Sequence, residues 1–207
     1  MKLSEMMNSN VSLLYKSHTI YSVLIKILYG KYFFNRYRDL RSYIPIGNTV
    51  LDVCSGDCNL YHFAIKGRNQ YTGVDINISK LKKNKNVNQK QLDIINDPIP
   101  KADIIILQGS LYQFLPNQKL VIDKLLFNAK KKVIISEPII NIANSENIFI
   151  AFIAKYTVNP GTGHKTKRFT KKSLDYFIQS NYNKIIESRF LIAGGRDLVY
   201  ILNKNNN

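Results

Sequence analysis

The spacing of hydrophobic and polar positions changes near residue 49, and the change divides the chain into two parts. Before it, apolar residues recur every three or four positions, as on one face of a helix. These residues are Leu13, Leu14, Ile20, Tyr21, Leu24, Ile25 and Leu28. The pattern predicts one or two helices over residues 3–44, with a break at Gly30. We expect residues 1–45 to form a helical cap before the main domain, which spans residues 46–207.

From residue 49 onward, short β-branched runs alternate with stretches of helical spacing. Several of the runs are hydrophobic without alternation, as in parallel strands that are covered on both faces. The expected strands are 49–53, 71–74, 91–94, 103–107 and 132–136, and the expected helices are 59–66, 78–83 and 116–129. This order of strands and helices predicts an α/β fold with a doubly wound sheet and helices on both faces.

The end of the chain follows a different pattern. Residues 170–180 have the spacing of a helix, and Thr170 is a suitable N-terminal cap. Two further strands are expected at 184–190 and 198–202, joined by a turn at Gly194 and Gly195. A connection this short favours antiparallel pairing. The sheet should therefore be mostly parallel, with an antiparallel pair at its C-terminal end.

The composition fits a folded protein of one domain with a short appended element. The chain has 207 residues, of which 45% are apolar, enough to bury a substantial core. Two cysteines, Cys54 and Cys58, are too few for the disulfide framework of a secreted protein. The first residues lack the pattern of a signal peptide, and charged residues interrupt the apolar stretch 11–34. We expect a cytoplasmic protein without a transmembrane span.

The chain is strongly basic, with thirty basic and fourteen acidic residues and a net charge of +16. Such a surface attracts phosphates, nucleic acids and anionic lipids, and the sign of the charge does not choose among them. The abundance of lysine, asparagine and isoleucine is also typical of an AT-rich genome, which raises the lysine count without any functional demand.

The turn after the first strand carries the clearest functional signal. Asp52 lies near the end of the strand, and small residues that include Ser55 and Gly56 follow before the next helix. A turn of small residues lets the backbone approach a ligand closely. A carboxylate before the turn would repel a pyrophosphate but could accept hydrogen bonds from an ammonium group. The sequence thus favours a ligand with an amine over one with a diphosphate.

The segment VLDVCSGDC, residues 50–58, resembles the first motif of the class I S-adenosylmethionine-dependent methyltransferases, D-x-G-x-G-x-G. Asp52 and Gly56 match this motif, while Cys54 and Cys58 stand where its first and third glycines usually do. Cys58 stands at the helix start, and two alternatives stay open for it: it packs beside the cofactor, which is the favoured interpretation, or it crowds the cofactor. The resemblance covers residues 48–202 and implies a Rossmann-like sheet with strand order 3-2-1-4-5-7-6.

Two further acidic residues follow the family's pattern at successive strand ends. The resemblance implies that Asp75 holds both ribose hydroxyls, that Asp93 receives the adenine amino group, and that the next backbone N–H meets a ring nitrogen. Taken singly, each aspartate could be only a turn former. The cofactor-binding residues implied for S-adenosyl-L-methionine are Asp52, Cys54, Ser55, Gly56, Asp75, Ile76, Asp93, Ile94, Gln108 and Gly109.

The loop after the fourth strand, QGSLYQF at 108–114, resembles the family's loop that faces the transferable methyl group. The Asn/Asp-Pro-Pro-aromatic signature of amino-group methyltransferases, which act on adenine or glutamine, is absent there. Its absence counts against methylation of exocyclic amines on nucleic-acid bases. If the acceptor must lose a proton, the candidates for a catalytic role are Tyr112, Glu137 and His164. No metal is expected, because two cysteines and three scattered histidines do not supply the four donors that zinc needs.

Residues 139–172 are expected to bind the acceptor. They contain an apolar run at 148–154 followed by a Gly-rich loop, which together suit a lid over the acceptor. The helices around 21–37 would complete this lid. A core helix with an exposed loop fits the same pattern equally well. The favoured acceptor is a small molecule: a metabolite, a sugar or a lipid precursor. Two alternatives stay open. One is action on RNA through the basic cluster between His164 and Lys172, with membrane-surface contact as a further use of that cluster; the other is a non-catalytic scaffold.

Overall fold

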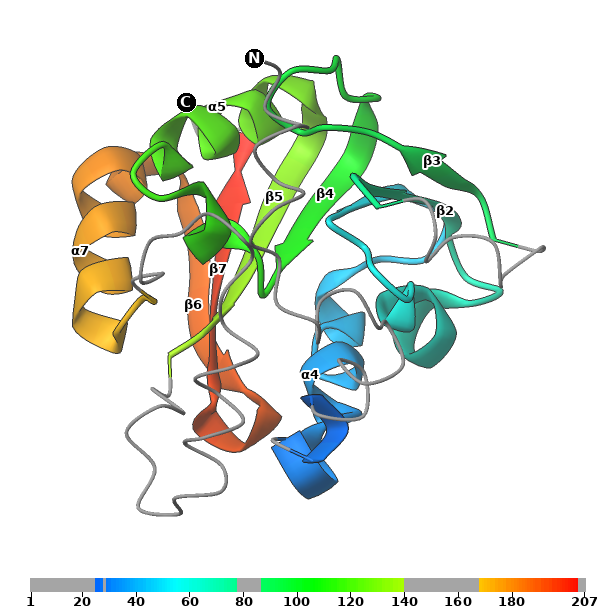
Figure 1. Cartoon of the computed structure of the whole chain (residues 1–207), viewed down its shortest axis with the longest axis horizontal. Helices are drawn as coiled ribbons and strands as arrows, with labels where there is room; N and C mark the ends of the chain where they lie inside the picture. Colours follow the sequence, from blue (N-terminus) through cyan, green and yellow to red (C-terminus); the bar gives the residue numbers. More distant parts are fainter. Residues whose placement is uncertain (1–24, 28, 78–86, 140–167, 205–207) are drawn as a thin grey trace, which may run out of the picture.

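The structure is a computed structural model of the chain, and it describes residues 25–27, 29–77, 87–139 and 168–204. Seven strands form one sheet in the order β3-β2-β1-β4-β5-β7-β6, which confirms the predicted order (Figure 1). The strands are β1 (Thr49–Val53), β2 (Gln70–Asp75), β3 (Gln89–Gln91), β4 (Ala102–Gln108), β5 (Ala129–Pro138), β6 (Ile186–Ile192) and β7 (Asp197–Asn203). The first five are parallel, whereas β7 runs antiparallel to both of its neighbours. The carboxyl ends of β1, β2, β4 and β5 therefore meet at one edge.

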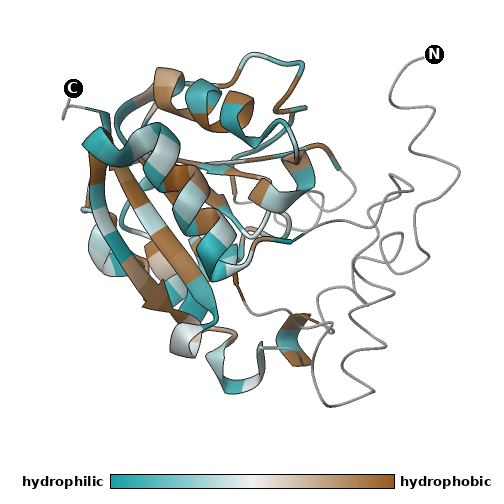
Figure 2. Cartoon of the chain, turned by 90° about the vertical axis from the view of Figure 1, so that its left-hand side faces the viewer, coloured by the Kyte–Doolittle hydropathy of each residue, from teal (hydrophilic) through white to brown (hydrophobic). Residues whose placement is uncertain are grey.

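Two long helices cover one face of the sheet, α5 (Gln118–Asn128) and α7 (Lys171–Tyr182). As predicted, α7 begins after Thr170, whose side chain accepts a hydrogen bond from the backbone N–H of Ser173. Both helices pack apolar side chains onto one core with the strands, among them Leu51, Ile105 and Val133. In Figure 2 the strands are hydrophobic over long stretches, while the helices that cover them also carry hydrophilic residues.

The opposite face of the sheet is covered by residues 29–44 and by a turn of π-helix, η3 (Tyr61–Ile65), at the predicted helix 59–66. The described part of the predicted cap is helical at residues 25–27 and 29 and continues with the short helices η1 (Gly30–Tyr32), α4 (Asn35–Arg38) and η2 (Arg41–Tyr43). No helix runs on through Gly30, because this residue has a φ of +53°. Residues 1–24 and the helix predicted at 78–83 lie outside the described residues.

The cap segment, residues 29–44, is fastened to the turn between β6 and β7. The ring of Tyr43 stacks on Phe190 with centroids 4.2 Å apart, and Asp39 accepts a hydrogen bond from the backbone N–H of Ala193. At the turn itself, a Cβ on Gly194 would lie 2.6 Å from the ring of Tyr32, so only glycine fits beside that ring. The cap segment and the C-terminal hairpin thus form one packed unit (Figure 1).

Candidate functional site

The loop that leaves β1 has the backbone of a glycine-rich motif although it holds a single glycine. Cys54, Gly56 and Cys58 have φ values of +58°, +51° and +53°. These are the three positions at which D-x-G-x-G-x-G has glycine. A left-handed conformation costs a residue with a Cβ about 1–2 kcal/mol, so the surrounding contacts must hold both cysteines in place. The loop therefore keeps the motif's conformation where the residue types depart from it.

The two cysteine side chains pack beneath the loop. Cys58 is fully buried, where its Sγ lies 3.8 Å from Ser55 Oγ and accepts a hydrogen bond from the side chain of Gln89. Cys54 is half-buried against the core that underlies α5 and α7. Burial raises the pKa of both thiols, so they stay neutral. Because Cys58 points into the core, its side chain does not crowd the outer surface of the loop.

Gly73 lets the loop close onto β2. A Cβ at this position would lie 2.8 Å from Ser55 Oγ and 2.9 Å from the hydroxyl of Tyr71. The empty space allows the Tyr71 ring to lie along the strand and donate to Asp52 Oδ2 at 2.8 Å. The Asp52 carboxyl is almost completely buried, and burial raises its pKa to about 7 against the opposing effect of the Tyr71 hydrogen bond. The free protein therefore holds this carboxyl only half-ionised at neutral pH.

Asp75 ends β2 and ties the loop to that strand. Its Oδ2 accepts the backbone N–H of Gly56 at 2.9 Å, and its Oδ1 accepts that of Asn77 at 2.9 Å. A carboxylate oxygen has two lone pairs, so each retains acceptor capacity after these bonds. The next residue, Ile76, is about half exposed. The carboxylate thus lies beside the loop with capacity for further hydrogen bonds.

Asp93 lies in a turn after β3, because the strand ends at Gln91 and not at the predicted position 94. Its Oδ1 accepts the backbone N–H of Ile95 and its Oδ2 accepts the side-chain amide of Asn96. These local bonds are those of an aspartate that shapes its own turn. The neighbouring Ile94 is buried. The structure therefore gives Asp93 a turn-forming role whether or not it also meets a ligand.

The loop after β4 is held by backbone and side-chain bonds from two directions. The backbone N–H of Gly109 donates to the carbonyl of Ser136 at 2.7 Å, and the Gln108 amide donates to the carbonyl of Arg36 in the cap segment at 2.7 Å. The backbone N–H of Leu111 donates to Glu137 Oε1 at 2.5 Å. Glu137 is 1% exposed, and burial raises its pKa to about 8. This carboxyl therefore holds the loop and is mainly protonated at neutral pH.

Tyr112 lies in the short helix η5 (Leu111–Phe114) of the same loop and is buried. The guanidinium of Arg168 lies over its ring, 4.4 Å from the centroid, with Nη2 3.5 Å from the hydroxyl. Arg168 also lowers the pKa of Glu137 through its charge, so these three side chains share one region. Of the predicted catalytic candidates, Tyr112 and Glu137 come together here. His164 lies outside the described residues, as does most of the predicted acceptor-binding segment.

A second buried group, which the sequence analysis missed, joins the cap segment to the start of β7. The Arg36 Nε lies 3.2 Å from Asp197 Oδ2, and both side chains are buried. Tyr29 donates its hydroxyl to Asp197 Oδ1, and its ring lies 4.3 Å from the Arg36 guanidinium. A charged residue directly before the apolar run 198–202 was the available signal for Asp197, but nothing local in the sequence links it to Arg36.

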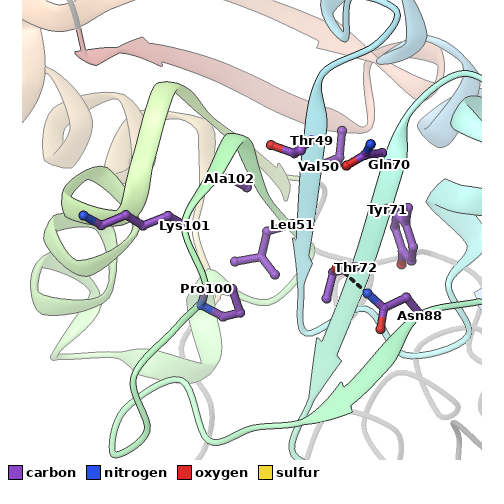
Figure 3. A pocket seen from close by; sticks show the side chains of 10 residues that line it. All are labelled: Thr49, Val50, Leu51, Gln70, Tyr71, Thr72, Asn88, Pro100, Lys101 and Ala102. Atoms are coloured by element: carbon purple, nitrogen blue, oxygen red, sulfur yellow. Dashed lines mark hydrogen bonds between the residues drawn. The ribbon is translucent and has the colours of Figure 1, made fainter.

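Other site types find no support among the described residues. No group of three His, Cys, Asp or Glu side chains could hold a metal ion there. Within the same ranges, no helix has the length and apolar content to cross a membrane. A hollow of about 190 Å³ lies near the starts of β1, β2 and β4, beside Thr49, Gln70 and Ala102 (Figure 3). Since strand starts lie away from the carboxyl edge, this hollow is not part of the loop site.

No model of a known protein family matches the sequence, and no curated protein matches it as a relative. Solved structures do resemble it. A putative S-adenosylmethionine-dependent methyltransferase from Methanococcus maripaludis has a TM-score of 0.60 and 19% identity, over 90% of this chain and 91% of that one. An S-adenosylmethionine-dependent methyltransferase from Clostridium acetobutylicum has a TM-score of 0.61 and 10% identity, over 89% of this chain and 97% of that one. Human N-acetylserotonin methyltransferase in complex with S-adenosylmethionine has a TM-score of 0.63 and 14% identity, over 92% of this chain and 57% of that one.

The likeness at these identities concerns the fold, which is that of the class I S-adenosylmethionine-dependent methyltransferases. The chain spans only 61% of another match, an O-methyltransferase family 2 protein from Planctomyces limnophilus in complex with apigenin (TM-score 0.59, 13% identity, 90% of this chain). The larger neighbours therefore contain parts with no counterpart here.

Proposed function

We propose that this protein binds S-adenosyl-L-methionine on the loop after β1 and transfers its methyl group to a small-molecule acceptor. One observation carries the proposal: the loop adopts left-handed backbone conformations at all three motif glycine positions, although cysteines occupy two of them. A chain maintains this strained conformation against a cost of about 1–2 kcal/mol per cysteine. A ligand that must approach the backbone closely supplies a reason for it.

The residues of the loop site suit the groups of this cofactor. Asp52 offers a buried carboxyl that a nearby ammonium would convert to its charged form, and Asp75 retains acceptor capacity for two vicinal hydroxyls. Further proposed contacts come from Ser55 and Gly56 in the loop and from Ile76 after β2. Cys54, Asp93, Ile94, Gln108 and Gly109 complete the proposed set. When bound, the cofactor supplies an electrophilic methyl group on a sulfonium.

The protein's own part is to position the reactants. Methyl transfer is an in-line displacement, and alignment of donor and acceptor lowers much of its barrier. We assign Glu137 the role of holding the β4 loop through Leu111, because its carboxyl is buried and mainly protonated. Tyr112 and Arg168 are the side chains of that loop region proposed to meet the acceptor. His164 stays a further candidate base from the sequence.

The proposed acceptor class is a small molecule. Among the structural neighbours, one is bound to apigenin and another is a magnesium protoporphyrin IX methyltransferase from Synechocystis (TM-score 0.52, 12% identity, 89% of this chain and 81% of that one). Apigenin and magnesium protoporphyrin IX are both molecules of low molecular mass. The RNA alternative rests on the basic cluster between His164 and Lys172, of which Arg168, Lys171 and Lys172 are described.

Calorimetry with S-adenosylmethionine, S-adenosylhomocysteine and NAD tests the cofactor directly. We expect S-adenosylhomocysteine to bind with a dissociation constant of about micromolar order, and Asp75→Asn to weaken it by roughly 1.5–3 kcal/mol. Asp123→Asn makes the same chemical change on the exposed side of α5 and should leave the affinity unchanged. Binding of NAD in place of both adenosyl ligands would overturn the proposal.

A further inference from the structure

The β4 loop region contains a cation for which the described residues supply no anion. Arg168 forms no ion pair with any described residue, and its Nε is buried without a hydrogen-bond partner. Among the described residues, Arg168 contacts the ring of Tyr112 and its hydroxyl, which lies 3.5 Å from Nη2 and therefore interacts weakly. A buried guanidinium N–H without an acceptor is costly, so the position favours an acceptor from outside this set.

The nearest carboxyl does not fill this role. Glu137 lies close enough for the charge of Arg168 to lower its pKa, but no described pair joins the two side chains within 4.0 Å. Its Oε1 is already bonded to the backbone of Leu111. Burial also keeps Glu137 largely protonated near pH 7, so it brings little negative charge to the guanidinium.

We propose, on the basis of the methyltransferase function above, that the acceptor carries a carboxylate and that Arg168 binds this carboxylate. A guanidinium presents its N–H groups in a planar fork that matches the two oxygens of a carboxylate. The same guanidinium lies against the buried ring of Tyr112, which holds it beside the loop after β4.

A carboxylate fits this position better than a phosphate. Arg168 is one cation at the edge of a buried region, and the adjoining lysines of α7, Lys171 and Lys172, are exposed. A phosphate dianion normally gathers several donors, whereas one guanidinium edge satisfies a carboxylate. Arg168 is therefore a specificity-determining residue of the acceptor site, and it is not a part of the cofactor loop.

A ligand-observed NMR titration tests the inference, with benzoate as the probe and the full chain saturated with S-adenosylhomocysteine. Benzamide, which has the same shape without the charge, and inorganic phosphate are the comparison probes. We expect benzoate to bind at least roughly fivefold more tightly than either. Arg168→Gln should weaken benzoate by roughly tenfold or more, Arg168→Lys by less, and Lys172→Gln not at all.

The affinity for S-adenosylhomocysteine serves as the fold control, and Arg168→Gln should retain it. Unchanged benzoate binding in this variant, or benzamide or phosphate binding as well as benzoate, would overturn the inference. If Arg168→Gln does not fold, the comparison of benzoate with benzamide on the unmodified chain decides. Failure of the chain to bind either adenosyl ligand, with benzoate still bound through Arg168, would remove the methyltransferase proposal and leave the carboxylate site.

Discussion

Replacing Glu137 by glutamine should make the protein more stable at alkaline pH, although the residue is buried and hydrogen-bonded. The amide oxygen of glutamine can still accept the backbone N–H of Leu111, so the β4 loop keeps its attachment. What the substitution removes is the cost of ionising a carboxyl in the core. A buried carboxyl that holds a loop is thereby a source of instability above a certain pH.

The sign and size of this effect on stability follow from the pKa of Glu137, which burial raises from 4.5 to about 8. The unfolded chain loses this proton near pH 4.5 and the folded chain near pH 8, so the folded state binds more protons between these values. The contribution to stability is fully present below pH 4.5 and is lost as pH rises through 8. At about 1.4 kcal/mol per pKa unit, the full difference is about 5 kcal/mol.

Urea denaturation at intervals from pH 5 to pH 9 measures this effect as the free energy of unfolding. The difference between Glu137→Gln and the unmodified protein should move in favour of the variant by about 2–5 kcal/mol over this range. Glu187→Gln makes the same chemical change at a partly exposed position on β6 and serves as the matched control. Parallel curves for Glu137→Gln and the unmodified protein would refute the reasoning.

Three further predictions concern the loop after β1. The affinity for S-adenosylhomocysteine, measured by calorimetry, should rise about 10- to 30-fold from pH 5.5 to pH 7.5, because Asp52 must lose its proton to pair with an ammonium. Asp52→Asn should abolish this rise. Gly73→Ala should destabilise the protein by about 1–3 kcal/mol in urea denaturation, because its Cβ would collide with Ser55 and Tyr71; an unchanged midpoint would contradict the proposed packing. Cys54→Gly should change the free energy of unfolding by less than about 1 kcal/mol. Cys54→Val should lower the free energy of unfolding further, because a β-branched residue is poorly accommodated at a φ of +58°. Equal effects of the two substitutions would count against the left-handed conformation.

The sheet could be predicted from the sequence because its signals are local. The run of β1 was predicted with the bounds that the structure has, since a short β-branched strand is followed at once by small loop residues. The Gly194-Gly195 turn similarly fixed the antiparallel pairing of β6 with β7. The strand order came from the family resemblance, and the structure confirms it.

Other features depend on contacts that periodicity does not encode. The predicted strand 91–94 looked continuous, but the Asp93 side chain bonds to its own turn and the strand ends at Gln91. The helix after the loop was expected, but an apolar spacing does not distinguish α-helical from π-helical hydrogen bonds, and a π turn forms at Tyr61–Ile65. The pair of Arg36 and Asp197 joins positions 161 residues apart, beyond the reach of any local pattern.

The same limit explains why the site residues were found unevenly. Asp52, Gly56 and Asp75 belong to short motifs, and the structure brings all three together around one loop. Tyr112 and Glu137 were proposed because they stand where the family often puts acceptor-facing groups, but their surroundings were not predicted. That Glu137 is buried and holds Leu111 follows only from the tertiary fold, and this contact changes its proposed role from moving a proton to positioning a loop.

Ionisable side chains of opposite charge type lie at the carboxyl edge of the sheet. Asp52 lies under the β1 loop with a raised pKa and accepts a hydrogen bond from the neutral Tyr71, while Arg168 lies by the β4 loop without an ion-pair partner among the described residues. Among the described residues, the buried Asp52 carboxyl has no cationic partner and the buried Nε of Arg168 has no acceptor, and both situations are unfavourable. A cofactor with an ammonium and an acceptor with a carboxylate would each relieve one of them. We expect the two ligands to bind at separate places on this edge, and pairing with Asp52 or with Arg168 to contribute to the binding free energy of each.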